Sequence, residues 1–225
     1  MLRSEVRQRL ALMLVTNSRL VEQRRDSFDL GQLTAAALRG GVTAVQLREK
    51  DQPARRILLW ARELRWLTRR AGALLLINDR VDVALAVAAD GVHLGQGSLD
   101  PATARRLLGP EAVVGVSVHN AIEMEQALAT GAVDYVVFGH VFATASKPGL
   151  APRGLEALRT LAAQSPLPVL GIGGITPENA HRVVAAGACG VAVMSALLLA
   201  PDPARQAAAL RRALVRGGLS HETGG

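Results

Sequence analysis

The segment PVLGIGGITPENAHRVVAAGACGVAVMSA, residues 168–196, places two short apolar runs on either side of a helical pattern. The runs 168–173 and 190–195 are almost continuously apolar, which is typical of strands covered on both faces of a parallel sheet. Pro177 gives the intervening stretch a helix start, and Gly187 gives it a stop. The segment therefore predicts a strand–helix–strand unit with parallel strands.

The same alternation continues along the rest of the chain. Further strands are predicted over residues 11–16, 44–49, 74–78, 91–95, 113–118 and 134–139. Helices are predicted over about 30–40, 53–71, 80–88, 101–108, 121–130, 154–164, 177–186 and 203–216. Eight strands, each followed by a helix, predict a single-domain α/β fold of the (β/α)8 TIM barrel type.

An internal repeat favours a closed barrel over an open sheet. Glycine stands just before every second strand, in GGVTAVQL, AADGVHLG, GAVDYVVFG and GACGVAVMS. A repeated (βα)2 unit closes into a ring, whereas a doubly wound sheet would show a switch point in the pattern. We assign residues 11–216 to the barrel, residues 1–10 to an N-terminal extension and residues 217–225 to a disordered tail.

Composition limits the classes of function that the chain can have. Its 225 residues carry a net charge of +7, and 49% of them are apolar. The charge comes mostly from arginines scattered over predicted helices, and only 3% of the residues are aromatic, so we expect no nucleic-acid partner. No apolar run reaches the ~18 residues of a membrane span, and the single cysteine indicates a reducing compartment. We therefore expect a cytoplasmic protein without a membrane partner.

Polar side chains collect at the ends of the predicted strands, where TIM barrels carry their active sites. Arg48 and Lys50 are spaced so that they share one side of an extended strand end, where they can hold a phosphate or a carboxylate. Both lysines of the chain, Lys50 and Lys147, lie at these ends. The predicted substrate-binding residues are Gln46, Arg48, Lys50, Asn78, Ser117, Thr144, Ser146 and Lys147.

Two titratable residues at the strand ends are candidates for chemical roles. His140 follows the sixth strand directly, and an imidazole near its ordinary pKa can accept and donate protons at neutral pH. Asp79, at the end of the third strand, is either a Mg²⁺ ligand or a helix cap. The segment 139–154 is rich in Gly, Pro, Ser and Thr, which predicts a loop over the site. Cys189 is expected to be a small core residue.

Glycine-rich turns after the seventh and eighth strands predict a phosphate site. Glycine lets backbone N–H groups approach an anion, and this position is the recurrent phosphate site of the fold. The predicted phosphate-binding residues are Gly173, Gly174, Met194 and Ser195. The alternative is that the glycines serve only the bend of the backbone.

Seven short motifs together point to a family. They are QLREK (46–50), INDR (77–80), HLGQ (93–96), GVSVHN (115–120), GHVFATASKPG (139–149), GIGGITPEN (171–179) and GVAVMSA (190–196). In this order and spacing the sequence resembles the thiamine phosphate synthase/thiazole tautomerase (TenI-like) superfamily over nearly its whole length. The resemblance implies a TIM barrel, a small phosphorylated thiazole as substrate and a homodimer.

The resemblance implies one of two activities. Thiamine phosphate synthases hold a diphosphate through Mg²⁺ with two aspartates, of which Asp79 matches the first and Ser98 stands at the place of the second. Ser98, together with His140 in the Gly-His-Val-Phe motif, resembles the tautomerase branch. We therefore predict a cofactor-free isomerase in which His140 moves a proton, with Mg²⁺-dependent thiamine phosphate synthesis as the alternative.

The predicted isomerase would convert 2-(2-carboxy-4-methylthiazol-5(2H)-ylidene)ethyl phosphate into the aromatic thiazole carboxylate phosphate. His140 would remove the proton at ring C2 and return one to the exocyclic carbon. A third hypothesis is a non-catalytic sensor that keeps the anion site without the chemistry.

Overall fold

The computed structural model describes residues 6, 9–24 and 27–219 of the chain. Within these residues eight parallel strands close into a barrel in chain order, with β1 paired to both β2 and β8. The strands are β1 (Leu12–Val15), β2 (Ala44–Leu47), β3 (Leu74–Asn78), β4 (Gly91–Leu94), β5 (Val113–Val118), β6 (Tyr135–Gly139), β7 (Val169–Ile172) and β8 (Gly190–Val193). The predicted (β/α)8 barrel is confirmed.

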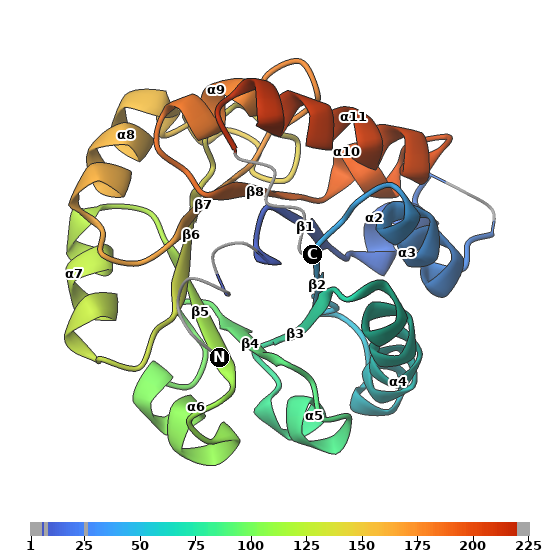
Figure 1. Ribbon diagram of the computed structural model, residues 1–225. Helices are drawn as coiled ribbons and strands as arrows, with labels where there is room; N and C mark the ends of the chain where they lie inside the picture. The colour runs from blue at the N-terminus through green and yellow to red at the C-terminus, as the bar shows by residue number, and fades with distance from the viewer. Residues whose placement is uncertain (1–5, 7–8, 25–26, 220–225) are drawn as a thin grey trace.

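Helices follow the strands along the chain and surround the barrel (Figure 1). They are α2 (Ser18–Glu22), α3 (Leu30–Arg39), α4 (Ala54–Ala71), α5 (Val81–Ala86), α6 (Pro101–Leu108), α7 (Ala121–Ala129), α8 (Gly154–Gln164), α9 (Ala180–Ala185), α10 (Ser195–Leu198) and α11 (Pro203–Arg216). The sequence does not predict the short helices α2 and α10. Helix α9 begins later than the predicted residue 177, because Asn179 closes a turn there by donating to the carbonyl of Gly174 at 2.9 Å.

Strand residues alternate between two apolar layers. Along β1, Leu12 and Leu14 belong to the layer between barrel and helices, whereas Met13 and Val15 belong to the layer inside the barrel. This alternation follows from the period of two residues in a strand. Cys189 is buried in the inner layer, as predicted for a small core residue.

Acidic side chains begin several of the outer helices. Asp29, Asp100 and Asp202 each accept a hydrogen bond from the backbone N–H three residues further on, in α3, α6 and α11. A carboxylate at this position satisfies one of the backbone N–H groups that have no partner within the helix. These caps fix where each helix starts after its strand.

The pairing of β1 with β8 closes the barrel, and on the outside α3 packs against α11. Gly40, which follows α3, lies so close to α11 that a Cβ atom there would stand 2.2 Å from the carbonyl oxygen of Ala204. Val6 and Leu10 of the predicted extension are buried against the inner layer, while residues 1–5 and 7–8 and the tail residues 220–225 lie outside the described residues. No helix in the described part of the chain is long and apolar enough to cross a membrane.

Candidate active site

A series of hydrogen bonds links strand ends at one mouth of the barrel. Nε2 of Gln46, on β2, donates to Oδ1 of Asn78 at 2.8 Å, and Nδ2 of Asn78 donates to Oδ2 of Asp79 at 2.6 Å. Ser98, in the loop after β4, donates its hydroxyl to Oδ1 of Asp79. The predicted residue Gln46 is therefore linked through Asn78 to the carboxylate of Asp79.

Asp79 does not cap helix α5. Its φ of 62° lies in the left-handed region, which aspartate adopts more readily than most residues. The carboxylate accepts from the side chains of Asn78 and Ser98 and from the N–H of Gly95 at 3.3 Å, and no side chain caps the start of α5. Of the two roles open to Asp79, the helix cap is therefore not observed.

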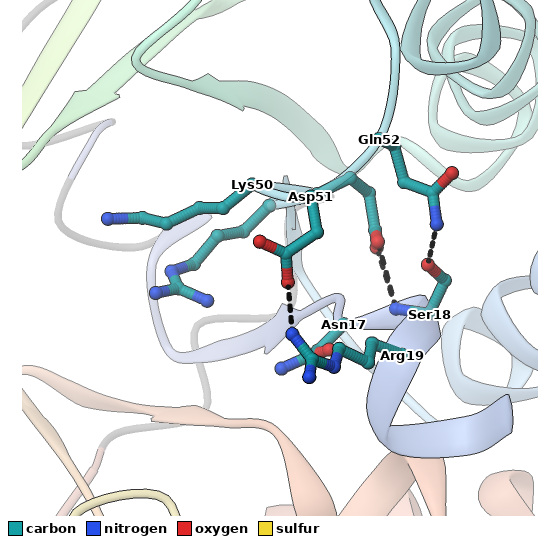
Figure 2. A pocket seen from close by; sticks show the side chains of 8 residues that line it. Asn17, Ser18, Arg19, Lys50, Asp51 and Gln52 are labelled. Atoms are coloured by element: carbon teal, nitrogen blue, oxygen red, sulfur yellow. Dashed lines mark hydrogen bonds and ion pairs between the residues drawn. The ribbon is translucent and has the colours of Figure 1, made fainter. Parts of the chain in front are cut away.

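Arg48 and Lys50 line a small polar cavity between the ends of β1 and β2 (Figure 2). Its volume of about 30 Å³ is roughly that of one water molecule. Both carboxylate oxygens of the buried Glu49 accept from the N–H of Ser18, at 3.1 and 2.9 Å, and thereby tie α2 to this loop. Figure 2 shows Lys50 extending away from the hydrogen bond between Gln52 and Ser18.

A second polar series runs into the interior of the barrel. Nε2 of His93, on β4, lies 2.9 Å from the hydroxyl of Ser117 on β5, and Nδ1 lies 3.0 Å from the hydroxyl of Tyr135 on β6. Burial lowers the pKa of His93 to about 4; the negative charge of Asp79 opposes this shift, and the positive charge of Arg48 adds to it. Burial also raises the pKa of Tyr135, so both side chains are neutral near pH 7.

A third group of side chains connects the loops after β4, β5 and β6. Oε2 of Glu123 accepts from Nε2 of Gln96 at 3.0 Å, and from the backbone N–H and Nδ1 of His119 at 2.8 and 2.9 Å. The other ring nitrogen of His119 lies 3.4 Å from Nζ of Lys147. Lys147 is thus held at the mouth by a residue of the neighbouring loop.

His140 lies at the end of β6, packed between the following loop and the turn after β7. Its side chain is buried, and Nε2 donates to the carbonyl of Leu150 at 3.2 Å. A Cβ atom on Gly173 would stand 2.3 Å from Cβ of His140, which shows how closely the turn approaches it. In the same loop Thr144 accepts from the N–H groups of Ser146 and Lys147, at 3.3 and 3.2 Å.

The turns after β7 and β8 present free backbone donors. Gly173 and Gly174 have φ values of 99° and 64°, a conformation that favours glycine. Among the described residues, the N–H groups of Gly174 and Ser195 have no hydrogen-bond acceptor. Met194 stands between β8 and α10, where its Sδ accepts from Nδ2 of Asn17 at 3.7 Å.

Sequence reasoning missed three side chains that organise this mouth. Glu49 and Glu123 appear in the sequence as ordinary charged residues, but each one accepts from a backbone N–H group, that of Ser18 and that of His119 respectively. Tyr135 appears as one more apolar strand residue. It is the only tyrosine of the chain and falls inside a predicted barrel strand. Those two facts could have identified it, because a buried hydroxyl needs a polar partner.

Comparison with known proteins places these residues in a family. The model of the family described as thiamine monophosphate synthase matches residues 12–197. A protein of Moorella thermoacetica named thiamine-phosphate synthase is 50% identical over 186 residues, which cover 82% of this chain and 88% of the relative. A synthase of Roseiflexus castenholzii is 49% identical over 84% of this chain and 82% of its own length.

A solved structure agrees with these relatives. The thiamine phosphate pyrophosphorylase from Pyrococcus furiosus superposes with a TM-score of 0.85 at 36% identity, covering 95% of this chain and 99% of that chain. The likeness therefore extends over the whole barrel and its mouth.

The predicted thiazole tautomerase activity is wrong, because the named relatives at about half identity are synthases, which are transferases, and not isomerases. That prediction depended on two positions, His140 and Ser98. The buried His140 donates to the carbonyl of Leu150, which gives it a structural contact in the loop. With its family model matched over residues 12–197, the chain belongs to the thiamine monophosphate synthase family.

Proposed function

We propose that this chain is a thiamine-phosphate synthase, which joins an aminopyrimidine diphosphate to a thiazole phosphate and releases diphosphate. The observation that carries the proposal is the 50% identity with the named synthase over 186 residues. Both substrates are phosphorylated small molecules, for which a mouth containing several cationic side chains is suited.

Three cationic side chains would bind the diphosphate. Arg48 and Lys50 stand at the end of β2, and Lys147 reaches the mouth from the loop after β6. Arginine offers a planar pair of donors to phosphate oxygens, whereas lysine acts as a mobile point charge. Gln46 and Asn78 would orient the aminopyrimidine beside these cations, since amide groups offer both donors and acceptors.

We propose Mg²⁺ as the cofactor, held by Asp79 together with the diphosphate. Mg²⁺ is usually bound by one or two carboxylates plus substrate phosphates and water. The donor set fits this pattern with a single carboxylate, and among the described residues no group of three His, Cys, Asp or Glu side chains could hold a metal ion by itself. Neutralising the charge of the departing diphosphate is the chemistry that Mg²⁺ supplies here.

The thiazole phosphate would bind at the turns after β7 and β8. The predicted residues Gly173, Gly174, Met194 and Ser195 belong to these turns. The N–H groups of Gly174 and Ser195, without an acceptor among the described residues, would donate to phosphate oxygens.

The proposal is tested by supplying the purified protein with both substrates and Mg²⁺. We expect thiamine phosphate and diphosphate to appear in equal amounts, and a metal chelator to stop the reaction. Asp79→Asn should reduce kcat/KM by at least about 100-fold, because it removes the carboxylate that binds Mg²⁺.

The matched control is Asp82→Asn, since Asp82 is an exposed aspartate on α5 whose contact is the ion pair with Arg80. We expect this variant to keep wild-type activity. Absence of condensation at any Mg²⁺ concentration, with the protein folded, would show that the chain is not a synthase.

A further inference from the structure

Three polar side chains, Tyr135, His93 and Ser117, are joined by hydrogen bonds that run from the apolar interior of the barrel to its mouth. Tyr135 is fully buried, His93 is 3% exposed, and their neighbours inside the barrel are apolar residues such as Leu76 and Val137. A polar group in such surroundings costs free energy unless it is hydrogen-bonded. The series ends at Ser117, which is partly exposed at the barrel mouth.

The direction of these hydrogen bonds follows from counting donors. Tyr135 has one hydroxyl hydrogen, and among the described residues its only hydrogen-bond partner is Nδ1 of His93. If Nδ1 carried the imidazole hydrogen, the hydroxyl hydrogen of Tyr135 would be buried without an acceptor, which is unfavourable. Tyr135 therefore donates to Nδ1, and the ring hydrogen of His93 resides on Nε2.

The orientation of Ser117 follows from the tautomer of His93. Nε2–H donates to Oγ of Ser117 across the 2.9 Å contact, so the hydroxyl accepts from the barrel interior. Among the described residues Oγ has no other partner, which leaves its own hydrogen free toward the mouth. The Ser117 hydroxyl thereby keeps its hydrogen available to donate at the mouth.

Packing around Tyr135 holds the phenol in this position. Gly115, on the neighbouring strand, faces the ring so closely that a Cβ atom there would stand 2.0 Å from Cζ and 2.4 Å from the hydroxyl oxygen of Tyr135. Only glycine leaves room for the ring at this place. The ring centroids of Tyr135 and His93 lie 5.6 Å apart, so the two rings are in contact.

We propose that Tyr135 is a positioning residue which, through His93, presents the Ser117 hydroxyl as a donor to an acceptor atom of the bound aminopyrimidine. The inference rests on the proposed synthase function for the identity of that substrate. A ring nitrogen with a free lone pair is the kind of atom that this donor selects.

The first test reads the tautomer and needs no activity. In wild-type protein labelled with ¹⁵N-histidine, we expect the His93 signals, assigned by their loss in His93→Gln, to show hydrogen on Nε2. In Tyr135→Phe, which removes only the hydroxyl, the Nδ1 signal should move to that of a ring nitrogen without a hydrogen bond, because Nδ1 loses its donor. A wild-type ring with hydrogen on Nδ1, or an Nδ1 signal unchanged in Tyr135→Phe, would overturn the proposal.

The second test is a double-mutant cycle in the synthase assay. Tyr135→Phe and Ser117→Ala should each lower kcat/KM for the aminopyrimidine diphosphate by roughly 3- to 10-fold, the equivalent of one hydrogen bond. Combined, they should lower it no further than Ser117→Ala alone, because Tyr135 acts on the substrate only through the Ser117 hydroxyl. The KM for thiazole phosphate should stay unchanged, and additive losses would contradict the coupling.

A matched control separates positioning from stability. Thr68→Val removes a buried hydroxyl on α4 that donates to the carbonyl of Arg65, and we expect unchanged kinetics from it. If wild-type protein forms no thiamine phosphate, the synthase proposal fails, while the tautomer measurement still decides whether Tyr135 orients His93.

Discussion

Ser98 determines how much negative charge the protein itself brings to the proposed metal site. Its hydroxyl donates to Asp79 at the position where the synthase pattern places a second aspartate. With one carboxylate in place of two, more of the oxygen ligands of Mg²⁺ must come from the diphosphate. Binding of the metal ion should therefore depend more strongly on the presence of substrate than in a site with two carboxylates.

This dependence predicts the effect of Ser98→Asp. The variant adds a negatively charged oxygen ligand beside Asp79, so the Mg²⁺ concentration for half-maximal activity should fall on the order of tenfold. Calorimetric titration of Mg²⁺ into protein with diphosphate should show the same change without any turnover. Ser98→Ala, which removes the hydroxyl and adds no charge, should give no such gain; an unchanged or weaker affinity in Ser98→Asp would contradict the argument.

At the scale of secondary-structure elements, the first turn of α7 is linked to the loop after β6 by hydrogen bonds that pass through His119. Asn120 and Glu123 cap this helix reciprocally: Oδ1 of Asn120 accepts from the N–H of Glu123 at 2.9 Å, and Nδ2 donates back to Oε1 at 3.1 Å. Glu123 also accepts from Nδ1 of His119. The remaining lone pair of His119, on Nε2, is thereby turned toward Lys147, 3.4 Å away.

Glu123→Ala should consequently affect both stability and substrate binding. Loss of the carboxylate, which accepts from Nδ2 of Asn120 and from the N–H of His119, should lower the free energy of unfolding by about 1–2 kcal/mol, as measured by urea denaturation. Loss of the contact that orients His119 should raise the KM for the diphosphate substrate by roughly threefold, because Lys147 is no longer held at the mouth. Glu125→Ala, an exposed residue of the same helix, is the control; equal KM values in the two variants would disprove the link to Lys147.

At the scale of the whole molecule, the barrel follows from periodic patterns, whereas the site depends on side-chain directions that no pattern contains. The predicted strands 74–78 and 113–118 coincide with β3 and β5, because long apolar runs have a clear signature. The short helices α2 and α10 have no such periodicity. The gathering of polar residues at one mouth follows from parallel strands sharing an edge, but the contact of Tyr135 with His93 does not.

The choice between two activities shows a second limit of sequence reasoning. His140 and Ser98, two positions that differ from the synthase pattern, favour the tautomerase branch when the sequence is taken alone. A buried histidine that hydrogen-bonds a loop carbonyl and one that transfers protons have the same sequence signature. The identity with named synthases over 186 residues separates the two interpretations.

The buried imidazole of His93 also makes the stability of the whole barrel depend on pH. Its pKa is about 4 in the folded protein, because burial disfavours the charged ring, against 6.5 for an exposed histidine. Between these two values the unfolded chain binds more protons than the folded one, so stability is lost as the pH falls through this window. A shift of this size corresponds to about 3 kcal/mol in total, at about 1.4 kcal/mol per pKa unit.

We therefore expect the free energy of unfolding to fall by about 2 kcal/mol between about pH 8 and about pH 5 through this one group. Urea denaturation at a series of pH values measures it. His93→Gln should be less stable than wild type near neutral pH, because it disturbs the contacts with Ser117 and Tyr135. Its stability should nevertheless change less with pH, since glutamine takes up no proton. Parallel pH profiles for the two proteins would show that His93 does not account for the loss.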